Sequence, residues 1–137
     1  MNTGKPGKIT VLIADDEAHI RLLLRKVMES MSCDVVGEAS NGRDAVELFR
    51  KTRPMITLLD INMPLMTGKE ALVEIIKEFP DALVIMLSSL SAMDVVKDCL
   101  EIGAANYIRK DTPIAEMKLH IKETWDDVTE NRKRPPA

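Results

Sequence analysis

The chain has 137 residues, of which 45% are hydrophobic, and a formal net charge of −3. This length fits one globular domain with its own core, and the acidic balance argues against a general nucleic-acid or membrane-surface binder, which needs a basic face. Cys33 and Cys99 lie far apart without metal-ligand spacing, which indicates reduced thiols. The first residues lack the apolar core of a signal peptide, and no apolar run is long enough to span a membrane, so we expect a cytoplasmic protein.

Five short apolar segments alternate with longer segments of helical periodicity. We expect the apolar segments to be strands, and they cover residues 9–14, 34–39, 55–60, 82–88 and 106–110. The first, third and fourth are almost continuously apolar, which is typical of strands covered on both faces by helices. The second and fifth are more mixed and suit the edges of a sheet.

The segments between them carry the signals of helices. After the first strand, apolar residues recur at three- and four-residue spacing from Ile20 to Met31. The helix-start signals are Asn41 before Gly42, a capping box of Thr67 and Glu70, a weaker Ser91–Asp94 pair, and Thr112 before Pro113. The apolar stripe of the last helix continues to near residue 128.

The strand–helix order predicts a doubly wound α/β domain of the flavodoxin-like type. We expect a five-stranded parallel sheet with strand order 2-1-3-4-5, right-handed crossovers and helices on both faces. Five units are too few for an eight-fold barrel. The predicted domain covers residues 8–128. Residues 1–7 are expected to be disordered, and the basic, proline-closed segment 129–137 is expected to be a disordered tail or a linker.

Polar side chains follow the predicted strands at their carboxyl ends. Asp15 and Asp16 follow the first strand, Asp60 ends the third, Ser88 ends the fourth and Lys110 ends the fifth. Because parallel strands end at one edge of a sheet, we expect three carboxylates to meet at the switch point between the first and third strands. Each acid alone is equally well explained as a cap or a partner of a helix dipole. Together they would repel one another unless they bind protons or a divalent cation such as Mg²⁺.

These residue types suit phosphoryl transfer to a carboxylate. Asp60 can act as a nucleophile, because a metal ion and Lys110 would neutralise the charge of an incoming phosphate. Lys110 offers a point charge to phosphoryl oxygens, and Ser88 offers a hydroxyl donor. Positioning and charge neutralisation are most of what this reaction requires.

With this set, the sequence resembles the receiver domain of two-component response regulators over residues 8–125. The resemblance rests on residues that stand in order at the strand ends: Asp15-Asp16, Asp60 within DINMP, Ser88, and Lys110 at the end of YIRK. It implies a signalling protein and not an enzyme, one that catalyses only its own phosphorylation and dephosphorylation. Asp60 would accept the phosphoryl group from a sensor histidine kinase or a histidine phosphotransfer protein.

The resemblance also implies how the cofactor and the phosphoryl group are held. Mg²⁺, or Mn²⁺, would be bound by Asp16, Asp60 and the backbone carbonyl of Asn62, with Asp15 contributing mainly through water. Ser88 and Lys110 would bind the phosphoryl oxygens. Ser88 stands where threonine is commoner in the family, a variant that keeps the hydroxyl.

Three further positions bear on switching and on the lifetime of the phosphoryl group. Tyr107 matches the aromatic switch that turns inward when Ser88 moves, although packing against a helix explains a strand tyrosine equally well. Asn62 and Leu90 match positions that tune dephosphorylation, and because Leu90 cannot orient a water we expect slow to moderate self-dephosphorylation. Lys110-Asp111 replaces a Lys-Pro pair that is cis in many receivers, which leaves the geometry of this loop open.

The resemblance implies that another protein reads the phosphorylated state. The face formed by the fourth helix, fifth strand and fifth helix is the expected contact for a downstream target. We expect neither direct nucleic-acid binding nor membrane contact, and we include a phosphorylation-dependent dimer among the expected assemblies. A stand-alone receiver, a phosphorelay intermediate and a fragment of a larger regulator all remain open.

Other functions share parts of this pattern. A Mg²⁺-dependent aspartyl-phosphate phosphatase of the haloacid-dehalogenase type needs a general acid two positions after the nucleophile, where this chain has Asn62. A flavodoxin needs a phosphate-binding loop after the first strand, where Asp15 and Asp16 would repel phosphate. A pseudo-receiver used only for binding is disfavoured by the complete set of acids.

Overall fold

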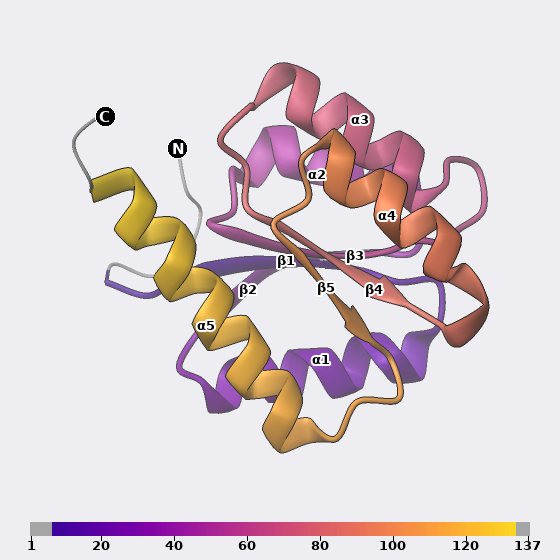
Figure 1. Ribbon diagram of the computed structural model, residues 1–137. Coiled ribbons are helices and arrows are strands. Elements are labelled where there is room, and N and C mark those ends of the chain that lie inside the picture. Colours follow the sequence, from indigo (N-terminus) through magenta and orange to yellow (C-terminus); the bar gives the residue numbers. More distant parts are fainter. Residues whose placement is uncertain (1–6, 134–137) are drawn as a thin grey trace.

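The computed structural model describes residues 7–133, which form one parallel sheet between two layers of helices (Figure 1). The strands are β1 (Thr10–Ala14), β2 (Asp34–Ala39), β3 (Ile56–Asp60), β4 (Val84–Ser88) and β5 (Asn106–Arg109). All neighbouring strands pair in parallel, in the order β2-β1-β3-β4-β5. The predicted fold class and strand order are therefore confirmed.

The helices divide into two layers that cover opposite faces of the sheet. They are α1 (Ala18–Ser30), α2 (Gly42–Thr52), α3 (Gly68–Glu78), α4 (Met93–Ile102) and α5 (Ile114–Lys133), with a 3₁₀ turn at Leu90–Ala92. In Figure 1, α1 and α5 lie on one face, and α2, α3 and α4 lie on the other. Each helix layer packs on its own hydrophobic cluster, one between the sheet and α2, α3 and α4, the other between the sheet and α1 and α5. Successive side chains of a strand point to opposite faces, so Leu12 and Ile13 of β1 belong to different clusters.

The burial of the strands explains their sequence patterns. Every residue of β1, β3 and β4 is buried, as expected for central strands covered on both faces. The edge strands β2 and β5 are mostly half-buried. Within residues 7–133, none of the helices combines the length and the apolar character that crossing a membrane requires.

Two of the predicted helix starts are confirmed. The Asn41 side chain accepts a 2.8 Å hydrogen bond from the backbone N–H of Asp44 at the start of α2. Thr67 and Glu70 form the reciprocal capping box of α3. Both signals act over three residues of sequence and depend little on the rest of the fold.

The other two helix starts differ from the prediction. Ser91 does not cap α4, because it lies inside the 3₁₀ turn and its hydroxyl is 3.0 Å from that of Ser89. The α5 helix begins one residue later than predicted, and the Pro113 carbonyl accepts its first hydrogen bond, 2.9 Å from the N–H of Met117. Pro113 therefore occupies the cap and not the first helical position.

The C-terminal boundary also differs from the prediction. The α5 helix runs to Lys133, so residues 129–133 are helical and the expected boundary at residue 128 is too early. No proline or glycine interrupts this segment before Pro135, and the Thr129 hydroxyl donates to the Trp125 carbonyl at 2.8 Å. Residues 1–6 and 134–137, the remainder of the predicted disordered ends, lie outside the described residues.

Candidate functional site

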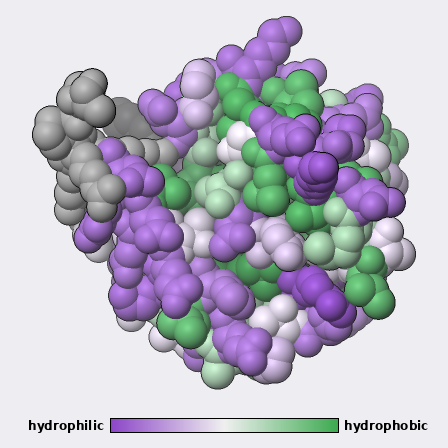
Figure 2. All heavy atoms as spheres, in the orientation of Figure 1, coloured by the Kyte–Doolittle hydropathy of each residue, from purple (hydrophilic) through white to green (hydrophobic). Residues whose placement is uncertain are grey.

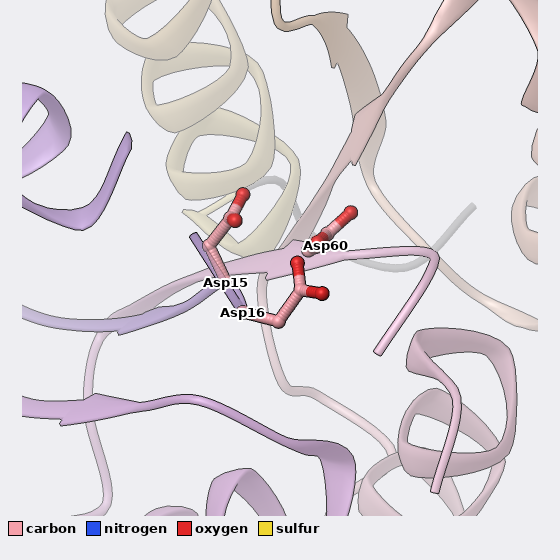
Figure 3. A group of neighbouring side chains, drawn as sticks. All are labelled: Asp15, Asp16 and Asp60. Carbon is pink, nitrogen blue, oxygen red and sulfur yellow. The ribbon is translucent and has the colours of Figure 1, made fainter. Parts of the chain in front are cut away.

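Three carboxylates meet at the carboxyl edge of the sheet. Asp15 and Asp16 directly follow β1, and Asp60 is the last residue of β3, the neighbouring strand (Figure 3). One oxygen from each of the three side chains lies within 4.8 Å of the other two. Asp15 and Asp60 are buried, whereas Asp16 is exposed. The predicted convergence of the three acids is present in the structure.

The ammonium group of Lys110 lies between the two buried acids. Its Nζ is 2.9 Å from Asp15 Oδ2 and 3.1 Å from Asp60 Oδ2. Both contacts are ion pairs without directed hydrogen-bond geometry, since neither Oδ2 atom has a hydrogen-bond partner within the described part of the chain. Two buried carboxylates therefore share one cation and keep unused acceptor capacity.

The titration of these groups follows from burial and charge. Burial raises the pKa of Asp60, and the nearby negative charge of Asp15 raises it further. Lys110 and the backbone N–H of Asn62 oppose both effects, and the resulting pKa of Asp60 is about 6, against an ordinary value of 3.8. Burial alone would lower the pKa of Lys110, but the close carboxylates of Asp15 and Asp60 outweigh it and raise that pKa. Ionisation of Asp60 above about pH 6 therefore adds a further negative charge to this site.

A small pocket opens beside these acids. It measures about 180 Å³ and is lined by polar groups, namely Asp16, Glu17, Asp60, Asn62, Ser89 and Lys110. Oxygen ligands of this kind, with unused carboxylate acceptors next to solvent, match what Mg²⁺ requires, because this ion binds one or two carboxylates and keeps several waters. The residues present fit a hard divalent cation.

Ser88 is the last residue of β4, the strand that neighbours β3. Ser88 is fully buried, and its hydroxyl has no hydrogen-bond partner among residues 7–133. The Ser88 carbonyl accepts a 2.8 Å hydrogen bond from the backbone N–H of Lys110, which joins the ends of β4 and β5. Ser89, and not Ser88, lines the pocket. The peptide bond between Lys110 and Asp111 is trans, since the described chain contains no cis peptide.

The positions predicted to act in switching and dephosphorylation lie in different environments; they are Tyr107, Leu90 and Asn62. Tyr107 on β5 is half-buried and packs against the hydrophobic cluster beneath α2, α3 and α4. Leu90 is 69% exposed on the 3₁₀ turn after β4. Asn62 is exposed, and its backbone N–H donates to Asp60 Oδ1 at 3.3 Å. Of these three residues, Asn62 therefore directly contacts Asp60.

The sequence reasoning missed residues that hold the loops of the site. The N–H of Gly68 donates to the Ile61 carbonyl at 2.8 Å, and a Cβ at Gly68 would overlap the backbone carbonyl of Asp60. Arg21 on α1 donates from Nη1 to the Asp15 carbonyl at 2.7 Å. Gly68, directly after the Thr67 cap, is a signal in the sequence for such a close approach, whereas nothing in the sequence pairs Arg21 with Asp15.

Comparison with known proteins identifies the family to which this fold belongs. The family model for the response regulator receiver domain matches residues 11–122. Chemotaxis protein CheY of Thermotoga maritima is 39% identical over 100 residues, which cover 73% of this chain and 83% of that protein. The protein-glutamate methylesterase/protein-glutamine glutaminase of Pyrococcus horikoshii is 38% identical over 124 residues, covering 88% of this chain but only 33% of that protein.

Comparison with solved structures also finds a protein of this family. The crystal structure of the CheX–CheY–BeF₃–Mg complex from Borrelia burgdorferi contains a chain that superposes with a TM-score of 0.81 at 31% identity. The match covers 85% of this chain and 89% of that chain. With a sheet order, an acidic centre and a family model that all agree, the chain belongs to the response regulator receiver domain family of two-component signalling.

Proposed function

We propose that this protein is a phosphorylation-activated signalling switch that accepts a phosphoryl group on Asp60 from a phosphohistidine of a kinase or phosphotransfer protein. The observation that supports this most is the pair of buried carboxylates on either side of Lys110. The Oδ2 atoms of Asp15 and Asp60 are buried without a hydrogen-bond donor in the described structure, next to a polar pocket. Two buried carboxylates so close together lower the stability of the fold. We infer that they are kept because they bind a divalent cation and a phosphoryl group.

In the proposed reaction, a carboxylate oxygen of Asp60 forms a bond to phosphorus as the bond between phosphorus and the donor nitrogen breaks. The electron pair of the broken bond stays with the histidine. Lys110 balances charge on the phosphoryl oxygens, and the free hydroxyl of Ser88 donates a hydrogen bond to one of them. Mg²⁺, when bound by Asp16, Asp60 and the Asn62 carbonyl, with Asp15 acting through water, would neutralise the remaining negative charge.

The proposed output uses Ser88 and Tyr107. Because the Ser88 hydroxyl has no partner among the described residues, phosphorylation would offer it a new acceptor and draw it toward Asp60. Tyr107 would then move inward from its half-buried position on β5. Coupling of this kind between two sites is typically about 1–3 kcal/mol. We propose that phosphorylation and the response of Ser88 and Tyr107 take place in the cytoplasm, where a kinase and a protein target would both be available.

A protein target fits the face that carries α4, β5 and α5. This face is turned toward the viewer in Figure 1, and Figure 2 shows hydrophobic side chains among hydrophilic ones on the same view. The helices α4 and α5 also carry exposed apolar residues, Leu100 and Leu119 among them. The Borrelia burgdorferi structure is a complex of CheY with CheX. We propose that a protein partner binds this face in the phosphorylated state.

Incubation with acetyl phosphate and Mg²⁺, followed by intact mass measurement, tests the proposal. We expect wild type to gain one phosphoryl group and Asp60→Asn to gain none, because the nucleophilic oxygen is lost. Asp98→Asn is the matched control, since Asp98 is an exposed acid that pairs with Lys69 on the protein surface. Unmodified wild type, or labelling that survives in Asp60→Asn, contradicts the proposal. Repeated turnover of a phosphomonoester would favour a phosphatase instead.

The lifetime of the phosphoryl group is expected to depend on Leu90. Leu90 directly follows Ser89, which lines the pocket, and its exposed apolar side chain cannot orient an attacking water. Leu90→Glu, with a polar end at the same place, is expected to hydrolyse the aspartyl phosphate several-fold faster than wild type. Phosphate release after removal of the donor measures the rate. Equal decay rates in Leu90→Glu, Leu90→Lys and wild type contradict this role.

A further inference from the structure

Arg21 reaches from α1 back to the loop that carries the acidic pair Asp15-Asp16. Its Nη1 atom donates a 2.7 Å hydrogen bond to the backbone carbonyl of Asp15. Asp15 is fully buried and is the first residue beyond β1, so its carbonyl lies past the end of the strand. The N–H of Asp15 is bonded separately, to the Ala39 carbonyl at 3.0 Å. Arg21 thus holds the peptide group that joins Asp15 to Asp16.

The carboxylate of Asp15 is held at the same time. Its Oδ1 accepts a 2.9 Å hydrogen bond from the N–H of Glu17, and its Oδ2 lies 2.9 Å from Lys110 Nζ. Rotation of the Asp15–Asp16 peptide would break this arrangement and would move the Asp16 carboxylate away from Asp60. The hydrogen bond from Arg21 opposes that rotation, because a buried carbonyl that loses its donor is costly.

Arg21 is itself held against the edge of the sheet. Its Nε lies 3.7 Å from Oε1 of Glu38 on β2, and its side chain is 22% exposed. The other oxygen of Glu38, Oε2, accepts a 2.7 Å hydrogen bond from Nε of Arg25, one turn further along α1. The two arginines therefore share one acid, but Arg21 donates to the loop as well, whereas the hydrogen bond of Arg25 goes to Glu38.

We propose that Arg21 is a positioning residue for divalent-cation binding, acting through the Asp15–Asp16 peptide. The inference rests on the proposed function, in which Asp16 and Asp60 hold the cation. Residues that orient metal ligands typically contribute about 10–100-fold to metal affinity. The charge of Arg21 has the opposite effect, since a guanidinium near the site repels a cation. Removal of Arg21 therefore weakens Mg²⁺ binding if the residue acts by positioning, and strengthens Mg²⁺ binding if it acts by its charge alone.

Calorimetric titration of the full chain with MgCl₂ distinguishes the positioning effect of Arg21 from the effect of its charge. We expect Arg21→Met to weaken Mg²⁺ binding about tenfold, and Arg21→Lys to recover most of the affinity because it keeps a donor of similar reach. Arg25→Met is the matched control, since it removes the same charge from the same helix and breaks the contact with Glu38. We expect it to bind Mg²⁺ as wild type does.

A second readout separates positioning from a general loss of activity. In labelling by acetyl phosphate, Arg21→Met is expected to need about tenfold more Mg²⁺ for the half-maximal rate and to reach the wild-type rate at saturating Mg²⁺. Should Arg21→Met fail to fold by circular dichroism, Arg21→Gln, whose side chain is shorter than that of arginine, replaces it in both measurements.

The outcomes are distinguishable. Wild type that does not bind Mg²⁺ contradicts the proposed function, and the inference fails with it. Wild type that binds Mg²⁺, together with an Arg21→Met variant that binds equally or more tightly, contradicts the inference alone. An Arg25→Met variant weakened as much as Arg21→Met, or no recovery in Arg21→Lys, also contradicts it.

Discussion

Lys110→Met is expected to lower the free energy of unfolding of the metal-free protein by about 3 kcal/mol at pH 8. The Lys110 side chain is 18% exposed and lies between two carboxylates that are 0% and 3% exposed. Methionine keeps much of the side-chain volume but removes the only cation paired with Asp15 and Asp60 in the described structure. Two buried like charges then remain uncompensated, which is far costlier than losing a surface pair.

The loss is expected to depend on pH in a defined direction. The pKa of Asp60 is raised from an ordinary 3.8 to about 6 in the folded state, so the fold disfavours the ionised form. The stability associated with protonated Asp60 is fully present below about pH 4 and is lost as the pH rises through about 6. Without Lys110 this pKa rises further. The destabilisation by Lys110→Met is therefore expected to be smaller at pH 5, where a proton replaces the ammonium.

Urea denaturation at pH 5 and pH 8, in the presence of a chelator, measures both expectations. Lys69→Met is the control, because its pair with Asp98 is exposed and is expected to contribute less than about 1 kcal/mol. Added Mg²⁺ is expected to restore part of the stability of Lys110→Met, since a second cation can pair with the acids. Equal losses for Lys110→Met and Lys69→Met, or a loss independent of pH, contradict this account of the site.

Gly68→Ala is expected to lower the free energy of unfolding by about 3 kcal/mol and to slow the proposed phosphorylation of Asp60. A Cβ at Gly68 would overlap the carbonyl oxygen of Asp60, and the clash is with backbone and not with a flexible side chain. The N–H of Gly68 also donates to the Ile61 carbonyl at 2.8 Å, which ties the start of α3 to the end of β3. Relief of the clash requires the chain at Asp60 to move.

Gly37→Ala provides the matched comparison for this substitution. Its Cβ would meet the end of the Leu12 side chain at 3.2 Å, where a small adjustment is available. Urea denaturation and the initial rate of labelling by acetyl phosphate are measured for both variants. We expect Gly68→Ala alone to lose both stability and labelling rate. Wild-type behaviour of Gly68→Ala, or an equal effect at Gly37, contradicts the proposed role of this close contact.

The sequence by itself determined the topology and the identity of the acidic centre. Continuous apolar runs predicted the central strands β1, β3 and β4, and the rule that parallel strands end at one edge brought Asp15, Asp16 and Asp60 together. The Asn41 and Thr67 caps were also predictable. These features depend on periodicity, chain direction or contacts over three residues, all of which can be deduced from a linear sequence.

The tertiary structure alone decided how the centre is held and charged. The raised pKa of Asp60 depends on its burial and on Asp15, which is remote in sequence. The hydrogen bonds from Arg21 to the Asp15 carbonyl and from Gly68 to the Ile61 carbonyl, just after β3, require the helices to be packed against the loops. The 3₁₀ turn at Ser91 likewise replaced a plausible local cap. Such features arise from packing between segments, and side-chain periodicity contains no information about the distances that packing sets.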